Sequence, residues 1–418
     1  MNKARTMGTA TVGTNGTLVL CGSGFLGLDD DVVEEDGAVY VFRLTVGALG
    51  EPVFTLVDKV AQGGTFPMWI CVHPSKIFAY VVDGGYGGRV HSYSIAATGK
   101  LSVLGPPVSS GGQVPCHGCV VAAKGGLPGF LLVTNFVGGS VAVLPIGPDG
   151  SLSDAVDVKQ HGKGANEHPR QTTAHPHWVG MDETGTHALV CDLGLNAVVV
   201  YRLDRSTGTL TERSRCVLHS KAGPRHLAFS RCGRFAYVIG ELDNSLTTLR
   251  YNATEGRLSR IEGGSVDLIA TNEGGATGAA AKGGGASEVV LDKSGKFAYC
   301  SVRTTGRFNA SPPAAFNRIV VLSLDPKTGL ATRVNTVSSG GSMPWSHVFA
   351  SERMLLVQNQ STLHSGLPEE EGGENDGHNG IGPGQIVAFH VGPGHRLRNS
   401  GVAATVPQAV SIALVSRL

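Results

Sequence analysis

Charge is scarce and balanced in this chain. Of its 418 residues, 16% are charged, and 34 basic side chains against 33 acidic ones leave a formal net charge of +1. A chain with so little net charge has no global field to attract nucleic acid or an anionic membrane. Any anion must therefore be bound locally, by a few side chains gathered at one place.

Long apolar runs are also missing. Segments such as Ala197–Tyr201 have the length of a strand, far below the roughly 20 residues that span a bilayer. Residues 1–14 lack the apolar stretch of a signal peptide. Aromatic residues make up 6% of the chain, without a basic stripe beside them. These absences predict a soluble intracellular protein with no nucleic-acid or membrane partner, and no pattern in the sequence fixes an oligomeric state.

Motifs of several enzyme classes are absent as well. Without a G-x-S-x-G elbow or an H-E-x-x-H pair, serine hydrolases and zinc peptidases lack their minimum residues. Residues 22–27 match the dinucleotide pattern G-x-G-x-x-G, but residues 28–37 are acidic and contain no apolar crossover helix. Cys116 and Cys119 have the spacing of half a zinc site, without a second pair at a suitable distance. The sequence therefore predicts no metal and no other cofactor.

Glycine and apolar residues are abundant. Sixty glycines and 41% hydrophobic residues favour many short strands joined by turns. Glycine suits turns that need a positive φ, whereas inside a helix it is less favourable than Ala by about 1 kcal/mol.

A strand-rich unit of roughly 45 to 55 residues recurs along the chain. Residues 70–82, 227–239 and 289–300 each read as a hairpin with a polar turn. Four short antiparallel strands per unit are typical of a propeller blade. We therefore predict one all-β domain over residues 1–418, a seven-bladed β-propeller of four-stranded antiparallel blades. The predicted blades lie near 14–66, 67–114, 115–174, 175–223, 224–286, 287–343 and 344–400, and a closing strand over 406–415 latches the ring.

Polar residues interrupt this pattern near the strand ends. His175 and His177 lie at the start of the fourth unit, and Arg225 lies at the corresponding place in the fifth. Glu241 and Arg303 follow equivalent strands of the fifth and sixth units. Because repeat-equivalent positions meet at the same end of a ring, we expect these side chains to gather in one site. A His, a Glu and two Arg can bind an anion and move protons beside it.

The motifs around these residues resemble the lactonase family of seven-bladed propellers, most strongly between residues 170 and 303. The motifs are Ala174-His175-Pro176-His177, Asp192-Leu193-Gly194, Gly223-Pro224-Arg225-His226, Gly240-Glu241-Leu242 and Ser301-Val302-Arg303. The resemblance implies a catalytic set of His177, Arg225, Glu241 and Arg303, and a substrate-binding set of Arg170, His175, Arg225 and Arg303. His117 and His226 are interpreted as structural. Trp345 departs from the family, which usually has an Arg there.

The same resemblance implies hydrolysis of a small anionic sugar lactone, with 6-phosphogluconolactone of the pentose phosphate pathway as the expected substrate. A general base must activate water, and Glu241 and His177 are both candidates. Arg225 and Arg303 are expected to hold the anion and to stabilise the developing oxyanion. Two alternatives stay open: a carboxymuconate-type lactonising cycloisomerase, and a non-enzymatic propeller scaffold that binds other proteins.

The sequence ends in Ser416-Arg417-Leu418, which differs from the peroxisomal Ser-Lys-Leu address by Arg in place of Lys. The same residues also fit the simple end of a last strand. We expect either a cytoplasmic protein or one that enters a peroxisome-type organelle through this tripeptide.

Overall fold

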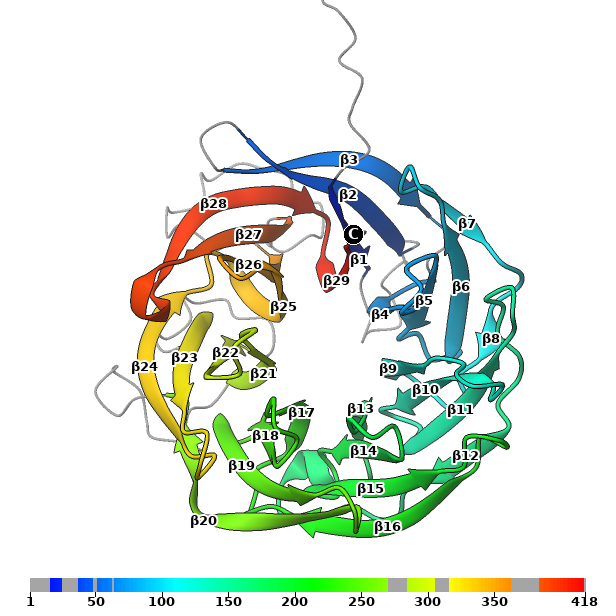
Figure 1. Cartoon of the computed structure of the whole chain (residues 1–418), viewed down its shortest axis with the longest axis vertical. Coiled ribbons are helices and arrows are strands. Elements are labelled where there is room, and N and C mark those ends of the chain that lie inside the picture. The colour runs from blue at the N-terminus through cyan, green and yellow to red at the C-terminus, as the bar shows by residue number, and fades with distance from the viewer. Residues whose placement is uncertain are drawn as a thin grey trace, which may run out of the picture.

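Seven antiparallel sheets stand around a central axis as a seven-bladed β-propeller (Figure 1). The computed structural model describes residues 16–24, 37–47, 51–61, 64–269, 284–304, 316–361 and 383–416. Within these ranges six sheets have four strands, and the second blade carries a further short strand. The predicted fold class, an all-β propeller of seven four-stranded blades, is confirmed.

Each of the first three sheets runs from an innermost strand at the channel to an outer strand at the rim. The first sheet consists of β29 (Ala409–Val415), β1 (Thr17–Ser23), β2 (Ala38–Val46) and β3 (Pro52–Val60). The second consists of β4 (Pro67–Val72), β5 (Phe78–Asp83), β6 (Arg89–Ile95), β7 (Leu101–Val103) and β8 (Val108–Ser109). The third consists of β9 (Pro115–Val121), β10 (Gly129–Asn135), β11 (Ser140–Ile146) and β12 (Asp157–Gln160).

The remaining four sheets follow the same order from the channel outward. The short 3₁₀-helix η1 (Pro169–Gln171) precedes the fourth sheet, which consists of β13 (Pro176–Met181), β14 (His187–Asp192), β15 (Ala197–Leu203) and β16 (Leu210–Val217). The fifth consists of β17 (Pro224–Phe229), β18 (Phe235–Gly240), β19 (Ser245–Asn252) and β20 (Arg257–Asp267). The sixth consists of β21 (Gly284–Leu291), β22 (Phe297–Thr304), β23 (Arg318–Leu324) and β24 (Ala331–Ser338). The seventh consists of β25 (Ser342–Ser351), β26 (Met354–Ser361), β27 (Gly384–Val391) and β28 (Leu397–Val406), with η3 (Pro393–His395) before β28.

The core lies between neighbouring sheets. The middle strands are apolar on both faces because each face packs against another blade: β14 is buried along its whole length, whereas the outer strand β16 is largely exposed. One cluster joins Leu132 and Val143 of the third blade to Val190 and Val199 of the fourth. Burial of each such side chain contributes about 1.5–3 kcal/mol, so contacts between blades hold the ring together.

The last strand of the chain closes the ring. β29 pairs antiparallel with β1, so the first and last strands of the described chain lie in one sheet. Gly22 makes this possible, because a Cβ atom there would lie 2.4 Å from both the Pro67 carbonyl oxygen and Ser411 Oγ. β29 starts later than the predicted 406, since Pro407 has no N–H to donate and Gln408 turns the chain with a φ of 41°. Val406 instead ends β28.

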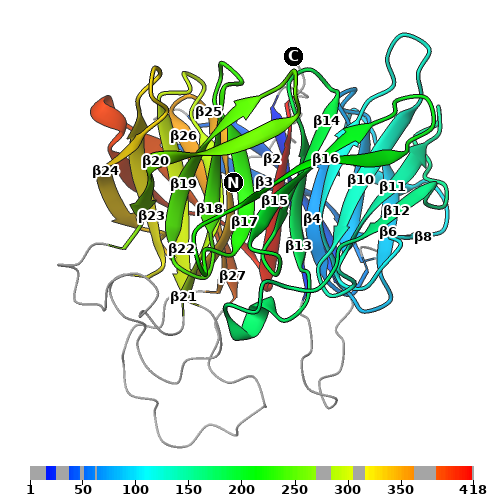
Figure 2. The same ribbon diagram turned by 90° about the horizontal axis from the view of Figure 1, so that it is seen from below.

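The two faces of the ring differ. The helix η1 and the starts of innermost strands such as β13 and β21 lie at the lower face in Figure 2, and the C-terminal end of the described chain lies at the upper face. Ser416 follows β29, while Arg417 and Leu418 lie outside the described residues, so the organelle address stays a prediction. In the described ranges no helix is both long and apolar enough to cross a membrane.

Candidate active site

A glycine turn places Arg225 beside Glu241. Gly223 has a φ of 62°, and a Cβ atom at this position would lie 2.4 Å from Cγ of Leu242. The backbone N–H of Glu241 donates to the carbonyl oxygen of Gly223 at 2.9 Å. This bond ties the start of β17 to the residue that follows β18, so Arg225 and Glu241 emerge side by side.

Three arginines surround the carboxylate of Glu241. Nη1 of Arg170 donates to Oε1 at 2.8 Å, and Nε of Arg225 lies 3.0 Å from Oε2 in an ion pair without hydrogen-bond alignment. Nη2 of Arg303 lies 3.7 Å from Oε1. These groups come from η1, β17 and β22, respectively. The structure thus brings together Glu241 and three arginines that the sequence placed in one site.

The charge of Glu241 follows from this setting. Burial alone raises the pKa of the carboxyl group, but the charges of Arg170, Arg303 and Arg225 outweigh it and bring the pKa to about 2. A carboxylate with so low a pKa has little tendency to take a proton at neutral pH. With its oxygens facing three guanidinium groups, Glu241 serves as the counter-charge that holds them.

Arg225 and Arg303 are bound differently. Arg225 is 1% exposed, and its Nη1 donates to the carbonyl oxygen of Ser287, so the protein holds this guanidinium on two sides. Nε of Arg303 is buried and has no hydrogen-bond partner among the described residues. Burial, together with the nearby charge of Arg225, lowers the pKa of Arg303 to about 9, so the group stays protonated at neutral pH. Arg303 thus has donors left for an anion, whereas Arg225 mainly positions Glu241.

Trp345 lies against the two buried arginines. Its ring centroid is 4.0 Å from Cζ of Arg303 and 5.9 Å from Cζ of Arg225. The indole also meets the ring of Phe66 edge-on, at 6.5 Å between centroids. This contact belongs to a cluster that contains Phe66, Met68, Cys116, Phe136, Trp345 and Val410. The residue that departs from the family motif therefore fixes the plane of the Arg303 guanidinium by cation–π stacking.

His177 lies near the start of β13, at the same face as the arginines. The thiol of Cys116 donates to its backbone carbonyl oxygen at 3.3 Å, and the ring of Phe136 meets its ring at 5.5 Å between centroids. Nδ1 is buried and lacks a hydrogen-bond partner in the described part of the chain. Burial holds the pKa of His177 well below its usual range, and the charge of Arg225 adds to this effect. The imidazole is therefore neutral at pH 7, and one of its ring nitrogens carries a lone pair, while burial and the nearby arginines disfavour its protonated form.

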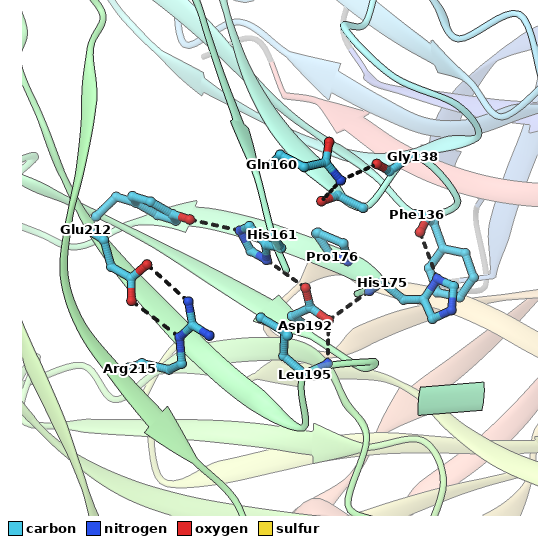
Figure 3. Close-up of polar contacts among 12 residues, drawn as sticks. Phe136, Gly138, Gln160, His161, His175, Pro176, Asp192, Leu195, Glu212 and Arg215 are labelled. Carbon is cyan, nitrogen blue, oxygen red and sulfur yellow. Dashed lines mark hydrogen bonds and ion pairs between the residues drawn. The ribbon is translucent and has the colours of Figure 1, made fainter. Parts of the chain in front are cut away.

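His175 lies two residues before His177, and other protein groups bind its side chain and backbone. Its Nδ1 lies 2.9 Å from the carbonyl oxygen of Phe136, and Nε2 lies 3.2 Å from Oγ1 of Thr173. Its backbone N–H donates to Oδ1 of Asp192 at 2.8 Å, and Oδ2 of Asp192 lies 2.6 Å from Nδ1 of His161 (Figure 3). Because protein groups occupy both ring nitrogens, His175 anchors the segment that carries His177, and its predicted contact with substrate stays a prediction.

The structure also adds a pair that sequence reasoning missed. Nδ1 of His226 lies 2.8 Å from Oε1 of Glu288, and both side chains are buried. Burial raises the pKa of Glu288 to about 7, against the opposing charges of His347 and Arg225. In the sequence, the segment Ala286-Ser287-Glu288-Val289 aligns with Pro224-Arg225-His226-Leu227 of the preceding unit. Glu288 thus stands at the position equivalent to His226, and this acidic residue is the sequence feature that could have indicated the pair. No motif drew attention to it.

A cavity of about 490 Å³ lies elsewhere in the molecule. Asp182, Cys232 and Arg234 are among the residues that line it, beyond the ends of β13 and β17. None of the predicted site residues borders this cavity. The charged side chains gathered around Glu241, and not this cavity, mark the candidate site.

Comparisons with known proteins identify the family of this chain. Residues 32–366 match the family described as "Lactonase, 7-bladed beta-propeller". A 6-phosphogluconolactonase of Bacillus subtilis is 29% identical over 332 residues, which cover 78% of this chain and 84% of the relative. A 6-phosphogluconolactonase of Serratia proteamaculans is 27% identical over 276 residues, with coverage of 65% and 72%. The structure of a periplasmic gluconolactonase of Pseudomonas aeruginosa has a TM-score of 0.72 and 25% identity, with 95% and 98% of the two chains covered.

The family match covers most of the chain, and the seven-bladed fold agrees with it. This chain belongs to the lactonase family of seven-bladed β-propellers.

Proposed function

We propose that this protein hydrolyses a small anionic lactone, and that 6-phosphogluconolactone is its substrate. The observation that carries the proposal is the buried Glu241 surrounded by Arg170, Arg225 and Arg303, with the neutral His177 at the same face. Relatives that are named 6-phosphogluconolactonases support the choice of substrate. A scaffold without catalysis has no need for such a cluster.

Charge in the cluster suits a dianion. Three guanidinium groups face one carboxylate, which leaves an excess of two positive charges among these four groups at neutral pH. A phosphate monoester carries about −1.5 to −2 at pH 7 and accepts several charge-assisted hydrogen bonds. Arg170, whose side chain is 43% exposed, is the guanidinium of the cluster that is most open to solvent, and we assign it to the phosphate.

In the proposed reaction the buried groups act on the ester. His177 takes a proton from water as the water oxygen attacks the lactone carbonyl carbon. The carbonyl oxygen then carries negative charge, and the unpartnered Nε–H of Arg303 donates to it. The charge of Glu241 holds Arg303 in place. The C–O bond of the ring breaks as the ring oxygen takes up a proton, which gives the hydroxy acid.

Hydrolysis by the purified protein tests this function. We expect the wild-type protein to open 6-phosphogluconolactone well above the spontaneous rate, and His177→Ala to lower kcat by about 10²-fold because the base is lost. His73→Ala, in the turn after β4 and far from the arginines, is the control and should keep the wild-type rate. A wild-type rate equal to the spontaneous one contradicts the function, and carboxymuconate in the same assay tests the cycloisomerase alternative.

Trp345 should affect turnover more than binding, because its ring holds the guanidinium that stabilises the oxyanion. We expect Trp345→Ala to lower kcat for an anionic lactone by up to about 10-fold, since a buried cation–π contact contributes about 1–2 kcal/mol. Trp345→Phe keeps an aromatic face over Arg303 and should stay near the wild-type kcat. Steady-state kinetics on the three proteins measures the effect. An unchanged kcat in Trp345→Ala means that stacking on Arg303 does not assist oxyanion stabilisation.

A further inference from the structure

A buried carboxyl group faces the site and plays no part in the reaction described above. Glu288 lies on β21, the innermost strand of the sixth blade, and its Oε1 lies 2.8 Å from Nδ1 of His226 on β17. The same oxygen accepts the backbone N–H of Val289 at 3.0 Å. Glu288 is 5% exposed and His226 is 3% exposed. A carboxyl group so enclosed, with an imidazole as its side-chain partner, is the arrangement of a proton-transfer pair.

The placement of His226 matches a need of lactone chemistry. The attacking water requires a base and the leaving ring oxygen requires an acid, and both oxygens are bonded to the same carbon as the ring opens. The two catalytic groups must therefore lie side by side. The ring centroids of His177 and His226 are 5.2 Å apart, on the neighbouring innermost strands β13 and β17. Glu288 occupies Nδ1 of His226, which leaves Nε2 for exchange with a substrate.

We propose that His226 is the general acid of this site and that Glu288 stores the proton it delivers, an inference that rests on the proposed lactonase function. His177 removes a proton from water as the water oxygen bonds to the carbonyl carbon. His226 gives its Nε2 proton to the ring oxygen as the C–O bond breaks, and takes the proton of Glu288 on Nδ1. The proton on His177 then passes to Nε2 of His226, and the Nδ1 proton returns to Glu288. His226 is the catalytic residue and Glu288 is a positioning residue.

The charges around Glu288 favour this role. The groups that face Glu288 are Arg225 and His226 on β17, Cys300 on β22 and His347 on β25. Burial raises the pKa of Glu288 to about 7, and it lowers the pKa of His226 well below its usual range. The proton of the pair therefore resides on the carboxyl group below about pH 7, and it is lost as the pH rises. Two neighbouring groups whose pKa values are driven apart are typical of acid–base assignments.

The pH dependence of kcat for an aliphatic anionic lactone tests the acid. After subtraction of the spontaneous rate, wild-type kcat should fall as the pH rises through about 7, because the stored proton is lost. In Glu288→Gln we expect kcat to be about 10²-fold lower at pH 6 and the fall with pH to disappear. Glu288→Asp keeps a titratable carboxyl group and should restore the pH dependence. A Glu288→Gln variant with the wild-type profile overturns the proposal.

The dependence of kcat on the leaving group is a second measurement. A purely structural role of Glu288 would not change this dependence. A carboxylated aryl lactone releases a phenol, whose pKa near 10 makes a proton donor less necessary than for an aliphatic alcohol. The kcat of Glu288→Gln on the aryl lactone should therefore be less than about 10-fold below the wild-type value. Equal losses on both lactones contradict the acid role. If the wild-type protein hydrolyses neither lactone, the proposed function is wrong, and this inference is wrong with it.

A matched control separates catalysis from folding. Asp182 is also a buried carboxylate beside a histidine, with Oδ2 3.5 Å from Nδ1 of His187, but it follows the far end of β13. Asp182→Asn should lower the Tm and leave the pH profile and the leaving-group dependence of kcat unchanged. His226→Gln should match Glu288→Gln, and the double variant should lose little more than either single one, because the two residues act as one unit.

Discussion

Glu241→Gln should abolish most lactonase activity and lower the free energy of unfolding by about 3–5 kcal/mol at neutral pH. Gln has the shape of Glu but no charge, so Arg225 and Arg303 would be left buried side by side with repelling charges. Removal of one member of a buried ionic cluster is strongly destabilising for this reason. Urea unfolding together with a lactone hydrolysis assay measures both effects.

The pH dependence of this loss has a definite sign. Glu241 has a folded-state pKa of about 2, against an ordinary value of 4.5. The stability it contributes is therefore fully present above about pH 4.5 and is lost as the pH falls towards 2. The difference in unfolding free energy between wild type and Glu241→Gln should shrink over this range.

An exposed ion pair is the control for the Glu241 variant. Glu212 lies 3.1 Å from Arg215 on the rim strand β16, and both side chains are about two-fifths exposed. Glu212→Gln should change the unfolding free energy by less than about 1 kcal/mol and leave activity intact. If Glu241→Gln is as stable as the wild-type protein at neutral pH, the arginines do not depend on this carboxylate.

The repeat made much of the site predictable. His177 and Arg225 lie at the starts of equivalent strands, so a ring brings them to one face whatever the details of packing. Glu241 and Arg303 are equivalent as well, although β22 continues to Thr304, so that Arg303 lies inside the strand that the sequence had it follow. Counting strands therefore located residues that are far apart in the sequence. The inner strands also predicted the core, because an uninterrupted apolar run such as Ala197–Val200 needs cover on both faces.

The chemistry of each group was less predictable, because it depends on neighbours that the repeat does not specify. The pKa of Glu241 reflects three arginines, one of which reaches it from the short helix η1. Arg225 and Arg303 look alike in the sequence, yet a backbone carbonyl group occupies one guanidinium and a tryptophan ring covers the other. The pairing of His226 was not predictable from the repeat, because its partner, Glu288, lies 62 residues away in the next blade.

Deletion of the closing strand should prevent stable folding. A chain that ends at Val406 loses all of β29, whose side chains Val410 and Val415 are fully buried and Ile412 nearly so. Each such side chain contributes about 1.5–3 kcal/mol, and their sum approaches the roughly 5–15 kcal/mol by which a whole domain is stable. We expect the shortened chain to show no cooperative thermal unfolding, measured by circular dichroism and calorimetry.

The loss extends beyond the side chains, because β29 is the innermost strand of a sheet that contains both ends of the chain. Without it, β1 presents an unpaired edge to the channel, and such edges promote aggregation. Ser411 Oγ no longer donates to the Pro67 carbonyl oxygen at 2.8 Å, so the first blade also loses a hydrogen bond to the second. A chain that ends at Ser416 retains all of β29 and should unfold at the wild-type Tm. If the chain that ends at Val406 unfolds cooperatively at that same temperature, closure by β29 does not hold the ring, and the contacts between the other blades are sufficient.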